Sequence, residues 1–276
     1  MEFNIYGSPF SHMWGGNLGY STHGQVPSYV NWKWNCDTHL YEDSFYMNFA
    51  IPTVINDTLS KKKYGAICES KAIIPHIFEG VKNEWEKYVE IFDTFFVHDY
   101  ELLSLHPKFK FAPPTGTWIK DKQVHPKTKL VSMITSAKTM CEGHITRLKW
   151  ADKLKDDIDM YGGYWRGITN KEEGLVDYMF SVAIENGVYD GLFSEKVLDC
   201  FATGTIPIYL GSKKITDFFN KDGIIFLEED FDIRSINEEL YYSKIEAVKE
   251  NFEKVKQFST FEDYVYLNYF KDGQSI

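Results

Sequence analysis

Short apolar runs alternate with stretches of helical periodicity through the second half of the chain. The expected strands are 130–135, 178–184, 206–210 and 224–227, and the expected helices are 143–155, 195–202, 213–219 and most of the tail from about residue 234. Apolar strands that alternate with amphipathic helices are typical of a parallel sheet covered on both faces. We therefore predict a doubly wound α/β domain, in which ligands bind at the carboxyl ends of the strands.

The first half has a less regular pattern. Its expected strands are Phe3–Tyr6, Tyr64–Cys68 and Thr94–Val97, and residues 79–91 have helical periodicity. The loop after the first strand carries Gly15, Gly16 and Gly19, which lack the GxGxxG spacing of a dinucleotide site. The run Lys61–Lys63 is expected in a solvated turn. Residues 106–128 contain four prolines and little periodicity, which predicts a connection between two domains.

Composition narrows the possible classes of protein. Of the 276 residues, 43% are hydrophobic and 25% are charged, which is the balance of a folded protein. The formal net charge is −10, so general binding to nucleic acid or to an anionic membrane is not expected. The sequence opens without a signal peptide, and no stretch approaches the roughly 20 apolar residues of a membrane span. We therefore expect a cytoplasmic protein without a transmembrane segment.

The segment 185–212 concentrates the candidate chemistry. A polar loop follows the preceding strand, and a helix then opens near Glu195, with Ser194 in position to cap it. Free backbone N–H groups at such a helix start, with Lys196 in the first turn, suit a phosphate group. An exposed helix start with an ordinary surface lysine is the other interpretation that this pattern leaves open.

This segment resembles the donor-binding signature of the family ten glycosyltransferases, the α-1,3/1,4-fucosyltransferases. The matching residues, which align without a gap, are Glu185-Asn186, Gly191, Ser194-Glu195-Lys196, Leu198-Asp199, Thr205 to Tyr209 and Gly211-Ser212. Weaker matches upstream are Ser136, Arg147, Tyr161 to Tyr164 and Asn170-Lys171-Glu172. The resemblance covers roughly residues 128–232. The first half resembles the family's acceptor domain only loosely, at Glu69-Ser70, Phe92-Asp93 and Asp99.

The resemblance implies a GT-B fold, in which two Rossmann-like domains face each other across a cleft. Residues 1–125 would form the acceptor-binding domain and 126–250 the domain that binds the nucleotide-sugar donor. Residues 251–276 would form a helical tail that packs back on the first domain. The implied reaction moves a sugar, usually fucose from GDP-fucose, onto a hydroxyl of a glycan acceptor, with inversion at the anomeric carbon. The resemblance implies neither a resident cofactor nor a metal.

The resemblance also implies roles for individual residues. Arg147 and Lys196 would stabilise the departing diphosphate, because an arginine chelates phosphate oxygens and a lysine adds a point charge. Glu195 would contact the ribose or the donor sugar, and Glu185 and Asn186 would shape the loop or bind the donor. The other expected donor-site residues are Tyr189, Ser194, Ser136 and Lys138.

The acceptor hydroxyl needs a general base, and a carboxylate from the acceptor domain would serve. Glu69 is the candidate catalytic residue. Its competitors are Glu79, Asp93 and Asp99, which lie in the same half of the chain.

Two departures from the family pattern concern the donor. The family often has a tyrosine two residues before its Thr-Glu-Lys; this position is Leu192 here, although Tyr189 lies in the same loop. The family's Ser-Asn pair is Ser136-Ala137, followed by Lys138, which is either a phosphate contact or a surface cation. The alternatives are therefore another GDP- or UDP-linked sugar, or a nucleotide- or carbohydrate-binding module that has lost catalysis.

Two further signals carry less weight. Asp157-Ile158-Asp159 is a DxD tripeptide, which binds a divalent metal in another transferase fold, but it falls at the end of a charged helix and we expect no metal site there. His144 lies one turn before Arg147 and either faces the phosphates or has a capping or surface role. The chain lacks the membrane anchor and stem of the family's Golgi members, which favours an enzyme of the bacterial or viral type.

Overall fold

The computed structural model describes residues 2–7, 25, 27–34 and 39–271, so the glycine-bearing loop at 15–19 lies outside the described residues. The chain divides into two compact units. The first consists of Met1–Gly116, Asp190–Leu192 and Gln257–Ile276, and the second of Thr117–Tyr189 and Phe193–Lys256. Each unit is built on a sheet whose strands pair in parallel, so the predicted α/β class is confirmed.

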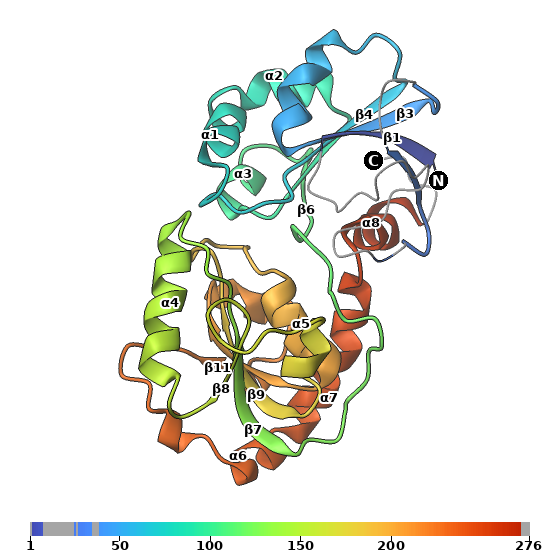
Figure 1. The fold of residues 1–276 in the computed structure, drawn as a ribbon. Helices are drawn as coiled ribbons and strands as arrows, with labels where there is room; N and C mark the ends of the chain where they lie inside the picture. The colour runs from blue at the N-terminus through green and yellow to red at the C-terminus, as the bar shows by residue number, and fades with distance from the viewer. Residues whose placement is uncertain (1, 8–24, 26, 35–38, 272–276) are drawn as a thin grey trace. The chain divides into compact units, whose positions relative to one another are not determined.

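A five-stranded sheet forms the second unit (Figure 1). Its strands are β7 (Lys129–Ile134), β8 (Asp159–Tyr161), β9 (Tyr178–Ile184), β10 (Ile206–Leu210) and β11 (Ile225–Phe226). Its helices are α4 (Glu142–Leu154), α5 (Glu195–Thr203), α6 (Glu238–Ser243) and α7 (Ile245–Val255), with short 3₁₀ turns at Lys171–Gly174, Lys213–Asp217, Lys221–Gly223 and Ile233–Ser235. The alternation predicted from the sequence is confirmed. Residues 213–219, however, form only a 3₁₀ turn, and the pattern missed β8 because three residues are too few to show a period.

The spatial order of these strands is β11-β10-β9-β7-β8, which reverses between β7 and β9. The chain moves from β7 to one side of the sheet and from β9 to the other. Because crossovers between parallel strands are right-handed, the helices that follow lie on opposite faces. Figure 1 shows α4 on one side of the sheet and α5 with α7 on the other. Ligands of such sheets bind beside this switch point, outside the carboxyl ends of the strands.

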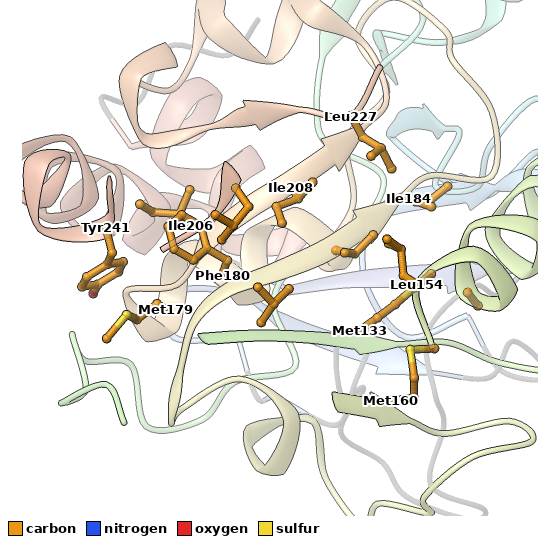
Figure 2. Close-up of a cluster of buried hydrophobic side chains, with 14 of the residues drawn as sticks. Met133, Leu154, Met160, Met179, Phe180, Ile184, Ile206, Ile208, Leu227 and Tyr241 are labelled. Atoms are coloured by element: carbon orange, nitrogen blue, oxygen red, sulfur yellow. The ribbon is translucent and has the colours of Figure 1, made fainter. Parts of the chain in front are cut away.

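The core of the second unit explains why β9 is apolar along nearly its whole length. Every residue of Tyr178–Ile184 is buried. Figure 2 shows Phe180 of β9 and Ile206 of β10 in the cluster that also contains Met133 and Tyr241. A central parallel strand is covered on both faces, so it has no solvent side and no polar alternation.

A six-stranded parallel sheet forms the first unit, in the order β2-β1-β3-β4-β5-β6. Its strands are β1 (Glu2–Tyr6), β2 (Asn31–Trp34), β3 (Asp43–Met47), β4 (Lys62–Ala66), β5 (Thr94–Val97) and β6 (Phe109–Phe111). Its helices are the 3₁₀ segment η2 (Asn48–Asn56), α1 (Pro75–Asn83), α2 (Trp85–Ile91), α3 (Tyr100–Leu103) and α8 (Phe261–Val265), which a π-helical turn at Tyr266–Phe270 follows. Phe270 packs 5.9 Å from Phe3 and 5.4 Å from Tyr64, measured between ring centroids, so the C-terminal segment contributes to this core.

The helical periodicity of residues 79–91 belongs to two helices rather than one. Glu84 leaves helical geometry, with φ −119° and ψ 25°, and separates α1 from α2. Its N–H still donates to Gly80 O, and Tyr88 N–H donates to Glu84 O. Because this spacing of four residues is the one found within a helix, the apolar period continues across the break and conceals it.

Two further expectations for the first half are corrected. Lys62 and Lys63 belong to β4 rather than to a turn, and the carboxylate of Asp93 accepts the backbone N–H of Lys63 at 2.9 Å. Residues 106–128 are not entirely a connection, since β6 lies within them and pairs with β5. The division between the two units falls after Gly116.

Glu262 in α8 is a carboxyl group sealed inside the first unit. It is 1% exposed, and no donor among the described residues bonds to its Oε2. Burial raises the pKa of Glu262 to about 8, and the charge of Asp263 acts in the same direction. The folded chain therefore keeps this group protonated at neutral pH, whereas a glutamate in an unfolded chain ionises at about 4.3.

This difference makes the stability of the fold depend on pH. Between about pH 4.3 and pH 8 the folded state binds more protons at Glu262 than the unfolded state does, so stability falls as pH rises through that window. Glu262→Gln keeps the shape and has no proton to lose. We expect the free energy of urea unfolding of the variant to exceed that of the wild type by an amount that grows with pH, from about 1 kcal/mol at pH 5 to about 4 kcal/mol at pH 8.

A matched control is Glu229→Gln, because Glu229 is an exposed loop residue. It should follow the pH dependence of the wild type. An unchanged pH dependence in Glu262→Gln would mean that the buried carboxyl is ionised in the folded chain.

Candidate functional site

Two loops meet at the switch point of the second unit. One follows β7 and leads into α4, and the other follows β9 and leads into α5. The backbone of Gly143, in the first turn of α4, lies directly against Asn186; a Cβ on Gly143 would overlap the carbonyl group of Asn186. Only glycine allows this approach, so the spacing of the two loops is fixed by contact between their backbones.

Arg147 of α4 fastens the end of β9. Its Nε and Nη2 donate to Ile184 O at 3.1 and 2.8 Å, and Nη2 also donates to Asn186 Oδ1 at 2.9 Å. The residue is 7% exposed, and although burial lowers the pKa of the guanidinium, an arginine remains charged in proteins. Arg147 is therefore more deeply embedded than a residue that only lines a cleft.

The amide of Asn186 has a defined orientation. A guanidinium can only donate, so the oxygen of Asn186 must face Arg147 and its NH₂ group must point away. His144 lies beside this pair, buried, and its Nδ1 accepts the backbone N–H of Met140 at 3.1 Å. Burial lowers the pKa of His144, and the nearby Arg147 and Lys138 lower it further. Burial of His144 contradicts the surface role considered from the sequence, and its bond to Met140 N–H lies just before the start of α4. The phosphate-facing role stays a prediction.

Ser194 caps α5, as the sequence predicted, since its side chain accepts the N–H of Lys196. Glu185 holds this cap in place. It is 2% exposed and accepts the N–H of Ser194 at 2.9 Å and its hydroxyl at 2.7 Å. Both carboxylate oxygens of Glu185 are thus engaged inside the protein, which fits the expected role of shaping the loop.

Lys196 lies in the first turn of α5 among acidic groups. Its Nζ is 3.0 Å from Glu195 Oε1 and 3.5 Å from Glu185 Oε2, and it also lies 3.0 Å from Ser194 Oγ. Burial opposes the charged form, but the two carboxylates outweigh it and raise the pKa of Lys196. Lys196 therefore carries its charge, at a helix start where backbone N–H groups favour an anion.

Lys171 and Asp199 extend this cluster, although neither was predicted as a site residue. Asp199, in α5, is 1% exposed; it accepts Lys171 Nζ at 2.8 Å and Trp118 N–H at 2.7 Å. Burial raises the pKa of Asp199 to about 6, while the charge of Lys171 opposes that rise. Both residues stood in matched motifs, but only the folded chain shows that they touch.

The remaining predicted donor residues lie in these two loops. Tyr189 packs its ring over Gly187, where a Cβ would overlap it. Ser136 is half-buried and Lys138 is exposed, both in the loop after β7. Leu192 is buried and is grouped with the first unit.

Glu69 lies in the first unit, three residues beyond the end of β4. Its Oε1 accepts the N–H of Ser70 at 2.7 Å. Because all strands of this sheet run parallel, Glu69 stands at the same edge as the residues that follow β5.

The DxD tripeptide has a structural partner. Asp159 belongs to β8, and its carboxylate accepts the hydroxyl of Tyr178 at 2.6 Å. Among the described residues, no three or more histidine, cysteine, aspartate or glutamate side chains are arranged to hold a metal ion.

A crystal structure of an alpha1,3-fucosyltransferase has a TM-score of 0.52 at 14% identity, covering 98% of this chain and 88% of that one. The GtfA/B complex has a TM-score of 0.50 at 12% identity, with coverages of 84% and 58%. These likenesses concern the fold, which is that of the GT-B glycosyltransferases, as expected.

The sequence model of the family described as Glycosyltransferase family 10 (fucosyltransferase) C-term matches residues 124–271, which is more than half of the chain. The chain belongs to this family of glycosyltransferases. An alpha-(1,3)-fucosyltransferase of Helicobacter pylori, FucT, is 32% identical over 77 residues, which span 28% of this chain and 16% of that protein. Along the described residues, no helix has the length and apolar character needed to cross a membrane.

The contact between Gly143 and Asn186 predicts that a methyl group added at residue 143 lowers the stability of the chain. Gly143→Ala should displace the loop after β9 and lower the stability of the chain by about 1–3 kcal/mol, despite the better helix propensity of alanine. The measurement is the free energy of urea unfolding. Gly167→Ala is the matched control, because no heavy atom lies within 4 Å of its added Cβ. If both variants were equally stable, the two backbones would not be in contact.

Proposed function

We propose that this chain transfers fucose from GDP-fucose to a hydroxyl of a glycan acceptor, with inversion at the anomeric carbon. One observation carries the proposal: Arg147 and Lys196 lie at the switch point of a Rossmann-like sheet, beside the start of α5. Membership of the fucosyltransferase family supports fucose as the sugar. A solved relative in complex with GDP also has this fold, with a TM-score of 0.50 at 16% identity.

The leaving group sets the electrostatic requirement. A nucleoside diphosphate gains negative charge as its bond to the sugar breaks, and fixed cations and helix N-termini stabilise that charge. Lys196, in the first turn of α5, is suited to the phosphates, while Arg147 holds the loop and Asn186 in place. Because these groups supply the positive charge, the proposal includes no resident cofactor. Tyr189, Ser136, Lys138 and Glu195 are proposed to complete the donor site.

Inversion by single displacement needs one general base on the acceptor side. Glu69 remains the proposed base because its competitors are placed less suitably. Asp93 precedes β5 and so stands at the amino edge of the sheet, where it binds the backbone of Lys63. Asp99 caps α3 by accepting the N–H of Leu102, and Glu79 is an exposed residue of α1.

A panel of nucleotides tests the donor. GDP and GDP-fucose should raise the melting temperature by several degrees at about 100 times the dissociation constant, since such a ligand stabilises the folded state by roughly 2.7 kcal/mol. UDP and UDP-sugars should give no shift. A melting-temperature shift with UDP compounds alone would contradict GDP-fucose as the donor. It would support a change of donor at the site where Leu192 stands in place of the family's usual tyrosine.

Glu69→Gln tests the base. The variant should lower kcat by about 100-fold or more and leave the affinity for GDP within about twofold, because the carboxylate acts on the acceptor rather than on the donor. Transfer of labelled fucose to a panel of oligosaccharides measures kcat. Glu79→Gln is the matched control and should keep full activity. Normal turnover by Glu69→Gln would move the base to another residue.

A further inference from the structure

Charged side chains of alternating sign form a row along the start of α5. Asp199 binds Lys171 at 2.8 Å, and Lys171 lies 3.9 Å from Glu195 Oε1. The same oxygen is 3.0 Å from Lys196, which is 3.5 Å from Glu185. Glu195 Oε1 therefore lies between two ammonium groups, one of which is closer to it than the other.

Lys196 faces a conflict if it binds a diphosphate. Its ammonium has three N–H donors. In this structure it donates to Ser194 Oγ and Glu195 Oε1, both at 3.0 Å, and it lies 3.5 Å from Glu185 Oε2. Binding of phosphate oxygens must replace some of these contacts. Glu185 is compensated within the protein, because Ser194 donates to both of its oxygens. Glu195 would instead bring an acidic group close to the incoming anion.

Lys171 is held where it can compensate Glu195. The backbone around Lys171 is fixed by a capping box. The side chain of Asn170 accepts the N–H of Glu173, and the side chain of Glu173 accepts the N–H of Asn170. The ammonium of Lys171 is anchored by Asp199, whose other oxygen is bound to the backbone of Trp118. The 22% exposed side chain of Lys171 thus has a buried anchor and a short path to Glu195.

We propose that Lys171 is a positioning residue that retains Glu195 when Lys196 turns to the diphosphate. The inference rests on the proposed function, since it requires a nucleoside diphosphate at α5. In this structure Lys196 is the closer partner of Glu195, at 3.0 Å against 3.9 Å for Lys171. When phosphate oxygens engage Lys196, Lys171 closes its 3.9 Å distance to Glu195 Oε1 and neutralises the carboxylate beside the bound anion.

Two simpler roles for Lys171 give different results. A lysine that attracts the diphosphate directly, or through its long-range field, adds the same affinity whether or not Glu195 is charged. A lysine that only neutralises the buried Asp199 affects folding and not the affinity for nucleotide. A double-mutant cycle between Lys171 and Glu195 separates these roles from the proposed one.

Calorimetric titration with GDP is the test, on the wild type, Lys171→Met, Glu195→Gln and the double variant. Lys171→Met should weaken GDP binding about 10-fold when Glu195 is present, and by less than about twofold when residue 195 is glutamine. Lys149→Met, which removes an exposed cation from α4, should leave GDP affinity within about twofold.

A second double-mutant cycle controls for an effect of Lys171→Met on folding. Because Lys171→Met leaves Asp199 without its cation, the cycle is repeated in the background Asp199→Asn, which keeps an acceptor for Trp118 N–H. A dependence on Glu195 of the same sign is expected there, and it should be smaller, because the ammonium of Lys171 has lost its anchor. Equal losses in the presence and absence of Glu195, or no loss in either, would overturn the inference while wild-type GDP binding upholds the proposed donor. Failure of the wild type to bind GDP would instead overturn the proposed donor, and the inference with it.

Discussion

The bond between a buried guanidinium and one strand end is the constraint on which the candidate site depends. Arg147 reaches from α4 across the point where the strand order reverses and holds the carbonyl of Ile184, the last residue of β9. The same group orients the amide of Asn186. Together with the backbone contact between Gly143 and Asn186, this cation fixes the loop that follows β9 relative to α4.

Charge in this region is balanced rather than simply positive. Arg147, Lys171 and Lys196 stand among Glu185, Glu195 and Asp199, and most of these groups are buried or nearly so. Buried ions are tolerated when each has a partner and further hydrogen bonds. Under the proposed function, phosphate oxygens of the donor would replace carboxylate contacts of Lys196 in this cluster.

Local patterns predicted the second unit well. Strand and helix alternation, the capping role of Ser194 and the family itself followed from residues that are close in sequence. The contact of Lys171 with Asp199 did not, because it joins residues 28 positions apart, and no local period reports such a pair. The short strands β6 and β8 were not predicted, because three residues are too few to show a period. The roles given to Glu69 and to the donor residues, and the division into acceptor and donor domains, stay predictions.

The absence of a side chain at Gly143 has a mechanical consequence. Since backbone meets backbone there, α4 cannot slide along its axis without moving Asn186. The helix has 13 residues and a length of about 20 Å, and its far end, Leu154, is embedded in the core. One end of α4 therefore lies against the loop that follows β9, and the other end lies in the hydrophobic core. A displacement of Asn186 toward α4 would therefore press on a helix whose far end is packed in the core.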